Sequence, residues 1–161
     1  MLSIAAGTGA ALGGVLDDRL GSKTVIVGSL LFLIVGALGV ISIDATHILF
    51  TVEVPAREPD LGLFASIGEQ AYLGFAVLIG LVSGPLQSAS RSLLARMAPK
   101  DRMSEFFGFF AFSGKVTAFA APFIIGLIAD MTGSLQTAMS VILVFLFAGL
   151  FIMSFVRTNR A

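Results

Sequence analysis

Five apolar stretches, most of them about as long as a bilayer is thick, dominate this sequence. A transmembrane helix needs about 20 consecutive apolar residues to cross a hydrocarbon core of ~30 Å. The stretches cover residues 1–16, 24–43, 72–95, 106–129 and 137–156. Of the 161 residues 57% are hydrophobic and 12% are charged, against roughly 45–50% and 25% in soluble domains. We therefore predict an all-α polytopic membrane protein with five transmembrane helices in a single transmembrane domain.

Composition also excludes several classes of function. Ten Lys and Arg balance ten Asp and Glu, and no basic cluster alternates with aromatic residues, so a nucleic-acid partner is not expected. The sequence has no Cys and only one His, which removes thiol chemistry and most zinc sites. No phosphate-binding loop or Ser/His/Asp set is present, so we expect no enzyme and no cofactor or metal. The expected surroundings are the lipid bilayer.

The basic residues indicate an orientation in the membrane. Eight of them fall at one end of the predicted spans, and Arg57 stands alone at the other. These eight are Arg19, Lys23, Arg91, Arg96, Lys100, Arg102, Arg157 and Arg160. By the positive-inside rule the C-terminus is cytoplasmic and the N-terminus is outside, in what we expect to be a bacterial plasma membrane. The outer segment 44–71 contains two prolines and is expected to lie along the membrane surface, or to act as a gating lid.

The turn after the first stretch carries a charged pattern. It places Gly14, Asp18, Arg19, Gly21 and Lys23 within ten residues. Gly21 can provide the positive φ that ends a helix, and Gly14 leaves room for a neighbouring helix. These features are also those of a simple loop that caps a helix and whose charges set the orientation of the spans.

The same pattern resembles the loop signature of the major facilitator superfamily, found between the second and third helices of each six-helix half. In that superfamily the aspartate and its basic partners form a charge relay that closes the two halves on the cytoplasmic side. The resemblance implies that Asp18 and Arg19 are gate residues and leaves Asp17 without a role. Ser22 departs from the family pattern, which usually has a basic residue there.

A second stretch narrows the resemblance. Residues 84–100, followed by 105–109 and 113–115, resemble the vacuole-effluxer-like branch of the superfamily, which includes fungal vacuolar amino-acid effluxers. This implies that the chain corresponds to the last five helices of a twelve-helix transporter. The first span, at about 24 Å, also looks clipped at its start. The remaining helices would come from the N-terminal part of the same protein or from a partner chain.

An internal repeat is consistent with that fold. The Gly, Asp, Gly spacing of residues 14–21 recurs at 126–133. Inverted three-helix repeats within one half would produce such a pair. Two unrelated helices that each end at a glycine would produce it as well.

Lys115 is the most unusual residue of the predicted spans. It lies about 15 Å into the membrane, where an ionised side chain costs at least ~2.5–3.5 kcal/mol. Small residues recur on its face of the helix, so it is expected to face the bundle or an aqueous cavity. It could bind a substrate carboxylate, respond to a coupling proton, pair with an acid on another helix, or reach carbonyl groups with no role in transport.

The third stretch has a polar seam. Gly80, Gly84, Gln87 and Arg91 fall within about 60° of one helix face. Together with Lys115, Gln87 and Arg91 are our candidates for lining a substrate cavity, although helix packing and an orienting arginine explain the seam too.

These features together predict a secondary transporter, or part of one, that moves a small polar solute by alternating access. Amino-acid efflux is one candidate activity. The alternative is a small membrane scaffold or assembly subunit without transport activity of its own.

Overall fold

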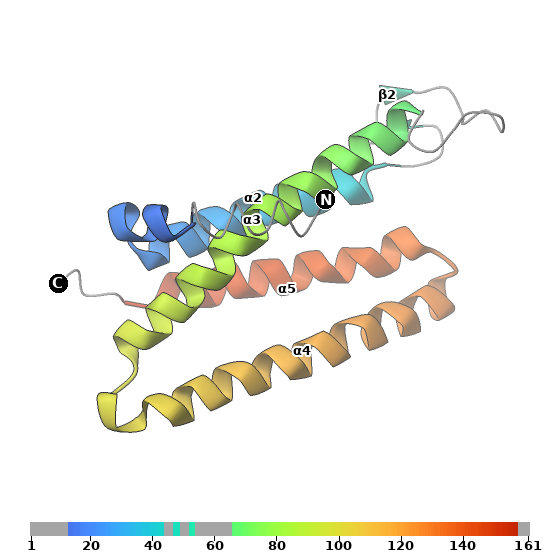
Figure 1. The fold of residues 1–161 in the computed structure, drawn as a ribbon. Helices are drawn as coiled ribbons and strands as arrows, with labels where there is room; N and C mark the ends of the chain where they lie inside the picture. The colour runs from blue at the N-terminus through green and yellow to red at the C-terminus, as the bar shows by residue number, and fades with distance from the viewer. Residues whose placement is uncertain (1–12, 44–46, 49–51, 54–65, 158–161) are drawn as a thin grey trace.

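The computed structural model describes residues 13–43, 47–48, 52–53 and 66–157. Its main elements are four long helices, α2 (Ser22–Ile41), α3 (Ile67–Met97), α4 (Met103–Thr132) and α5 (Leu135–Phe155), shown in Figure 1. All four regions are long and apolar enough to cross a membrane. Residues 13–20 are helical as well, whereas residues 1–12 of the predicted first span lie outside the described part. The predicted membrane-spanning all-α fold is confirmed.

Short elements connect the helices. A two-residue antiparallel pair, β1 (His47–Ile48) with β2 (Val52–Glu53), follows α2, and a 3-10 turn, η1 (Lys100–Arg102), joins α3 to α4. Most of the predicted outer segment 44–71, with both of its prolines, lies outside the described residues. Its end is helical, because α3 begins at Ile67, five residues before the predicted start. Ser66 caps α3 and Glu69 completes a capping box, a pairing that satisfies two free backbone N–H groups.

Helix α2 is the centre of packing. Nine of its residues are buried, and it contacts both α3 and α5. Val25, Ile26 and Leu30 of α2 join Ala89 of α3 and Met153 of α5 in one hydrophobic cluster. Close approach requires glycine here, because a Cβ added at Gly39 would overlap the ring of Phe75.

Polar contacts hold both ends of the α2–α5 pair. At one end Lys23 Nζ donates to the carbonyl oxygens of Val156 at 2.6 Å and Ser154 at 3.3 Å. At the other, Gln136 Nε2 donates to the carbonyl oxygens of Ile43 at 3.0 Å and Ile41 at 3.4 Å. The start of α2 therefore lies beside the end of α5, and the two helices are antiparallel (Figure 1).

Helix α4 packs far less. It forms a hairpin with α5 and touches α3 only near their connection (Figure 1), and none of its 30 residues is buried. Its large apolar side chains are open, with Phe109 at 71% and Phe119 at 77% exposure. An apolar helix surface is stable in contact with lipid or with another helix. This exposure is therefore compatible with a membrane-spanning chain.

Candidate functional site

One end of the bundle gathers most of the charge. The segment 13–23, the end of α3, η1, the start of α4 and the end of α5 all lie there, as the alternating direction of the helices requires. Seven of the eight basic residues predicted to share a face belong to these segments, and Arg160 lies outside the described residues. We refer to this region as the basic end.

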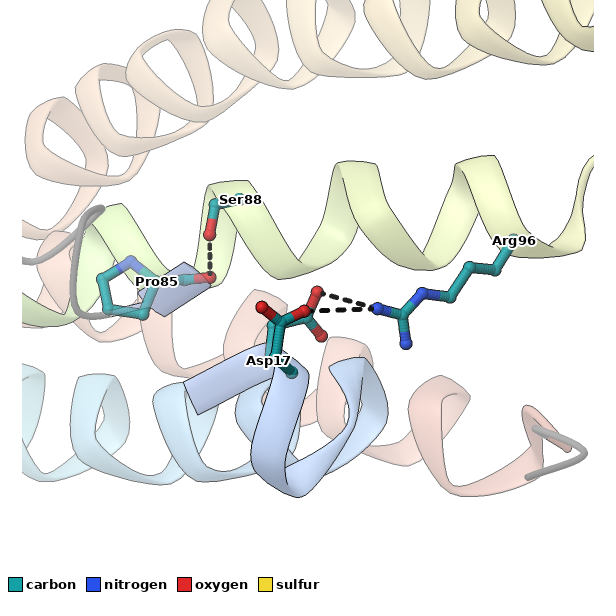
Figure 2. A network of polar contacts seen from close by, with 5 residues as sticks. Asp17, Pro85, Ser88 and Arg96 are labelled. Carbon is teal, nitrogen blue, oxygen red and sulfur yellow. Dashed lines mark hydrogen bonds and ion pairs between the residues drawn. The ribbon is translucent and has the colours of Figure 1, made fainter. Parts of the chain in front are cut away.

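An ion pair at the basic end joins two segments that are far apart in sequence. Arg96 Nη2, on the last turn of α3, lies 3.6 Å from Asp17 Oδ2 and 4.0 Å from Asp18 Oδ1. Figure 2 shows the guanidinium reaching across to the end of the helical segment 13–20. Both separations exceed hydrogen-bond length, so the contact is electrostatic and loose. It connects the first described helical turns to the third long helix.

The two aspartates differ sharply in burial. The side chain of Asp17 is 5% exposed, that of Asp18 is 83% exposed, and that of Arg96 is 55% exposed. Asp17 Oδ1 is buried and has no hydrogen-bond partner among the described residues. A buried carboxylate is costly unless it is paired, so Arg96 matters most to Asp17. Breaking this contact would leave the Asp17 charge buried without compensation.

The structure gives a partner to an acid for which the resemblance implied no role. Asp17, the acid without an expected role, is the buried partner of Arg96, whereas Asp18 lies at the edge of the contact and Arg19 is exposed. A residue in helical conformation turns by about 100° from its neighbour, so the sequence alone does not show which of two adjacent acids faces α3. The sequence marks Arg96 only as one of the charges that orient the spans, and its pairing with Asp17 is seen only in the fold.

The close helix approach occurs one residue before the predicted position. A Cβ added at Gly13 would lie 2.6 Å from the Cα of Pro85 and 3.1 Å from Ser88 Oγ. At Gly14, which is exposed, no described atom comes within 4 Å of such a Cβ. Among the described residues the close approach is therefore made at Gly13, and the expectation that Gly14 admits a neighbouring helix stays a prediction. Gly13 packs on Pro85 of α3, and Figure 2 shows this proline on the same helix as Arg96 of the ion pair.

Gly21 has the predicted positive φ. Its φ of 82° and ψ of 146° are in an extended region that is essentially restricted to glycine. Its N–H donates to the carbonyl of Asp17 at 2.9 Å. At the repeated spacing, Gly133 has φ 66° and ψ 8°, and its N–H donates to Ala129 at 2.8 Å. The two turns thus share one hydrogen bond at the same register, although their ψ angles differ.

Lys23, the last residue of the pattern, binds a different helix from the aspartates. Its ammonium group donates to the carbonyls at the end of α5, where a cation also interacts favourably with the helix dipole. The segment 17–23 therefore connects the basic end of α3 to that of α5.

The polar seam of α3 divides into two parts. Gly80 and Gly84 are buried, whereas Gln87 and Arg91 are exposed. The seam therefore has a packed half before Pro85 and an open half after it. Among the described residues, Gln87 and Arg91 have no charged partner, and their surroundings are open.

Lys115 is exposed near the middle of α4. It lies twelve residues after the first residue, Met103, which is about 18 Å along the helix. No ion pair or hydrogen bond from its side chain is found among the described residues. The structure therefore does not bring Lys115 together with Gln87 and Arg91 in one closed cavity.

A family model that covers residues 1–161 matches this chain, and its description is vacuole effluxer Atg22 like. The chain belongs to this family. Autophagy-related protein 22 of Cryptococcus neoformans var. neoformans serotype D is 37% identical over 92 residues, which are 57% of this chain and 16% of that protein. The protein of the same name from Yarrowia lipolytica is 30% identical over 123 residues, 70% of this chain and 21% of its own length.

A bacterial protein matches too. An uncharacterized MFS-type transporter, YxiO, of Bacillus subtilis is 35% identical over 81 residues, which are 50% of this chain and 19% of the transporter. The predicted vacuole-effluxer-like branch of the major facilitator superfamily is confirmed by these matches. In each of these relatives the chain covers about a fifth of the length. No solved structure matches.

Proposed function

We propose that this chain forms part of a secondary transporter that moves a small polar solute across a membrane by alternating access. The family description and the name of the Bacillus relative both refer to transport proteins rather than enzymes. Amino-acid efflux is the candidate activity that the family resemblance suggests. The observation that carries the proposal is the loose ion pair of Arg96 with Asp17 and Asp18.

That ion pair has the properties of a contact that is made and broken. Its separations of 3.6 and 4.0 Å leave the direct hydrogen bonds unmade. Because the Arg96 side chain is half exposed, it can move into solvent without displacing the hydrophobic cluster, although the Asp17 carboxylate is then left unpaired. Alternating access needs an equilibrium between states separated by only a few kcal/mol. A contact worth about 1.4 kcal/mol changes such an equilibrium tenfold. We assign Asp17 and Arg96 as an inner latch that holds this loop against α3 in one of the two states, with Asp18, Arg19, Gly14 and Gly21 shaping the loop.

The proposal includes an orientation and a solute route. The basic end faces the cytoplasm, because cytoplasmic ends of spans are rich in Lys and Arg. A bacterial plasma membrane is the proposed compartment, supported by the Bacillus relative; the family description makes a vacuolar membrane the alternative. Gln87 and Arg91, exposed on α3, are proposed to line the solute route. Cysteine labelling from each side of the membrane at Arg157 and His47 tests the orientation.

Flux measurements test the transport activity. The full natural protein is reconstituted into vesicles, and the flux of labelled neutral amino acids is compared for the native sequence, Arg96→Ala and Lys100→Ala. Lys100 is an exposed cation of the same basic end without an ion pair among the described residues, so it is the matched control. We expect Arg96→Ala to change the transport rate by roughly tenfold at equal protein level, and Lys100→Ala to leave it unchanged. A native protein without flux of any tested solute favours the scaffold alternative.

A further inference from the structure

The face of α4 around Lys115 is turned away from the rest of the chain. At about 100° per residue, Lys115 and Ile124 are nine positions apart and point in opposite directions. Ile124 and Ile128 are partly buried, which indicates that α4 packs against α5 on the side opposite Lys115. Lys115 therefore projects from the open side, midway along a helix that is apolar enough to cross the bilayer.

No described acid can neutralise Lys115 within the membrane. Glu69 and Glu105 lie in the first turns of α3 and α4, Asp130 lies at the end of α4, and α2 and α5 contain no Asp or Glu. The remaining described carboxylates belong to the segment 17–18, β2 and η1. An ammonium group at mid-membrane is normally paired or turned toward a polar cavity. Its counter-charge must come from outside the described residues.

The same face is built for close approach of another helix. Gly108, Ala111 and Ala118 lie seven, four and three positions from Lys115, so they fall on its side of α4. A Cβ at Gly108 would meet no described atom within 4 Å. Small residues in such a row let helix backbones come together in a membrane. The open charge and the row of small residues are independent features that favour the same kind of occupant.

We propose that the Lys115 face of α4 binds another transmembrane helix, and that this helix carries an aspartate or glutamate that pairs with Lys115. Lipid tails offer no counter-charge. A second copy docked symmetrically on this face would bring two like charges together. A carboxylate on a solute would neutralise Lys115 only while the solute is bound. A helix carboxylate satisfies it throughout. The matched stretches are 16% and 19% of the relatives, so the rest of such a protein has ample chain to supply one.

Site-specific crosslinking in native membranes tests this proposal without measuring flux. A photoreactive amino acid is placed at Ala118 in the full natural protein, and the crosslinked peptide is identified by mass spectrometry. The matched control carries the same probe at Val144, which is 67% exposed on α5. We expect Ala118 to crosslink to a transmembrane segment that contains an intramembrane Asp or Glu, and Val144 to give mainly lipid adducts.

Charge exchange then decides whether that acid pairs with Lys115. Lys115→Glu is expected to lower the crosslink yield by roughly tenfold, and replacement of the partner acid by lysine in the same protein is expected to restore it. If Lys115→Glu does not accumulate, Lys115→Met combined with a neutral partner replaces it, and the double variant is expected to melt above either single variant. Adducts with lipid alone, with α4 of a second copy or with a segment lacking an acid overturn the proposal, as does failure of the exchange to restore the yield. A transporter that keeps its flux under any of these outcomes leaves the proposed function intact.

Discussion

Helices α2 and α4 are both apolar enough to cross a membrane, yet they relate to the rest of the chain in opposite ways. Helix α2 buries nine of its 20 residues against α3 and α5, and α4 buries none of its 30. The difference lies in close contacts such as that of Gly39 with Phe75, which α4 lacks among the described residues. Hydropathy therefore identifies a span but not what the span packs against. The first of these helices stabilises the chain, and the second presents a surface.

The largest effect is expected where α2 is tightest. Gly39→Val would push a branched side chain into the ring of Phe75, and overpacking of this kind costs about 3 kcal/mol at the upper end of its usual range. Gly114→Val is the control on α4, where no described atom lies within 4 Å of an added Cβ. Unfolding by denaturing detergent should show a large loss of stability for Gly39→Val and almost none for Gly114→Val. Equal losses would remove the distinction between the two helices.

The next largest effect is expected at the ion pair, where Arg96 has a charged partner and Arg91, on the same helix, has none among the described residues. Arg96→Ala leaves the buried Asp17 carboxylate uncompensated, and we expect a loss of about 2 kcal/mol in the free energy of unfolding, less than for a fully buried pair because Arg96 is half exposed. Arg91→Ala, on the same helix, should have little effect in the isolated chain. Asp17→Asn should be more damaging than Asp18→Asn. A larger effect for Asp18 would restore the assignment suggested by the family resemblance.

The two glycine turns should respond differently to asparagine. Asparagine tolerates the left-handed conformation of Gly133 but not the extended positive-φ conformation of Gly21. Thermal melting is therefore expected to show Gly21→Asn to be less stable than Gly133→Asn by about 1.5 kcal/mol. If the two variants melt together, the difference in ψ between the turns has no energetic consequence.

The smallest effect concerns the end of α5. Lys23→Met loses the hydrogen bonds to the carbonyls of Val156 and Ser154, worth about 1 kcal/mol. Trypsin cleavage at Arg157 should become faster, because the end of α5 opens more often. Lys100→Met, at an exposed position of η1, is the control and should leave the cleavage rate unchanged. Unchanged cleavage in Lys23→Met would show that α5 is held by its apolar contacts alone.

The sequence was sufficient to predict the four long helices, because the apolar stretches from residue 24 onward are each about as long as a bilayer is thick, and Gly21 and Gly133 mark where helices end. The family also follows from short motifs. The contact partners of individual side chains cannot be predicted from the sequence in this way. Asp17 rather than Asp18 is buried, and Gly13 rather than Gly14 meets Pro85, because a shift of one residue rotates a helix position by about 100°. Such choices depend on how helices cross, which hydropathy does not encode.

The most direct test of whether the open face of α4 contacts another transmembrane helix is its accessibility to lipid in the native membrane. These 161 residues contain no cysteine. Once any cysteine elsewhere in the full natural protein has been replaced, a fluorescent label can be placed at a single cysteine introduced at Ala118 on α4 or at Phe147 on α5, and quenched by nitroxide-bearing lipids. We predict that a label at Ala118 in the full natural protein is shielded from quenching, whereas a label at Phe147 is quenched strongly. Equal and strong quenching at both positions would show that α4 faces lipid, and would contradict the conclusion that its open face meets another helix.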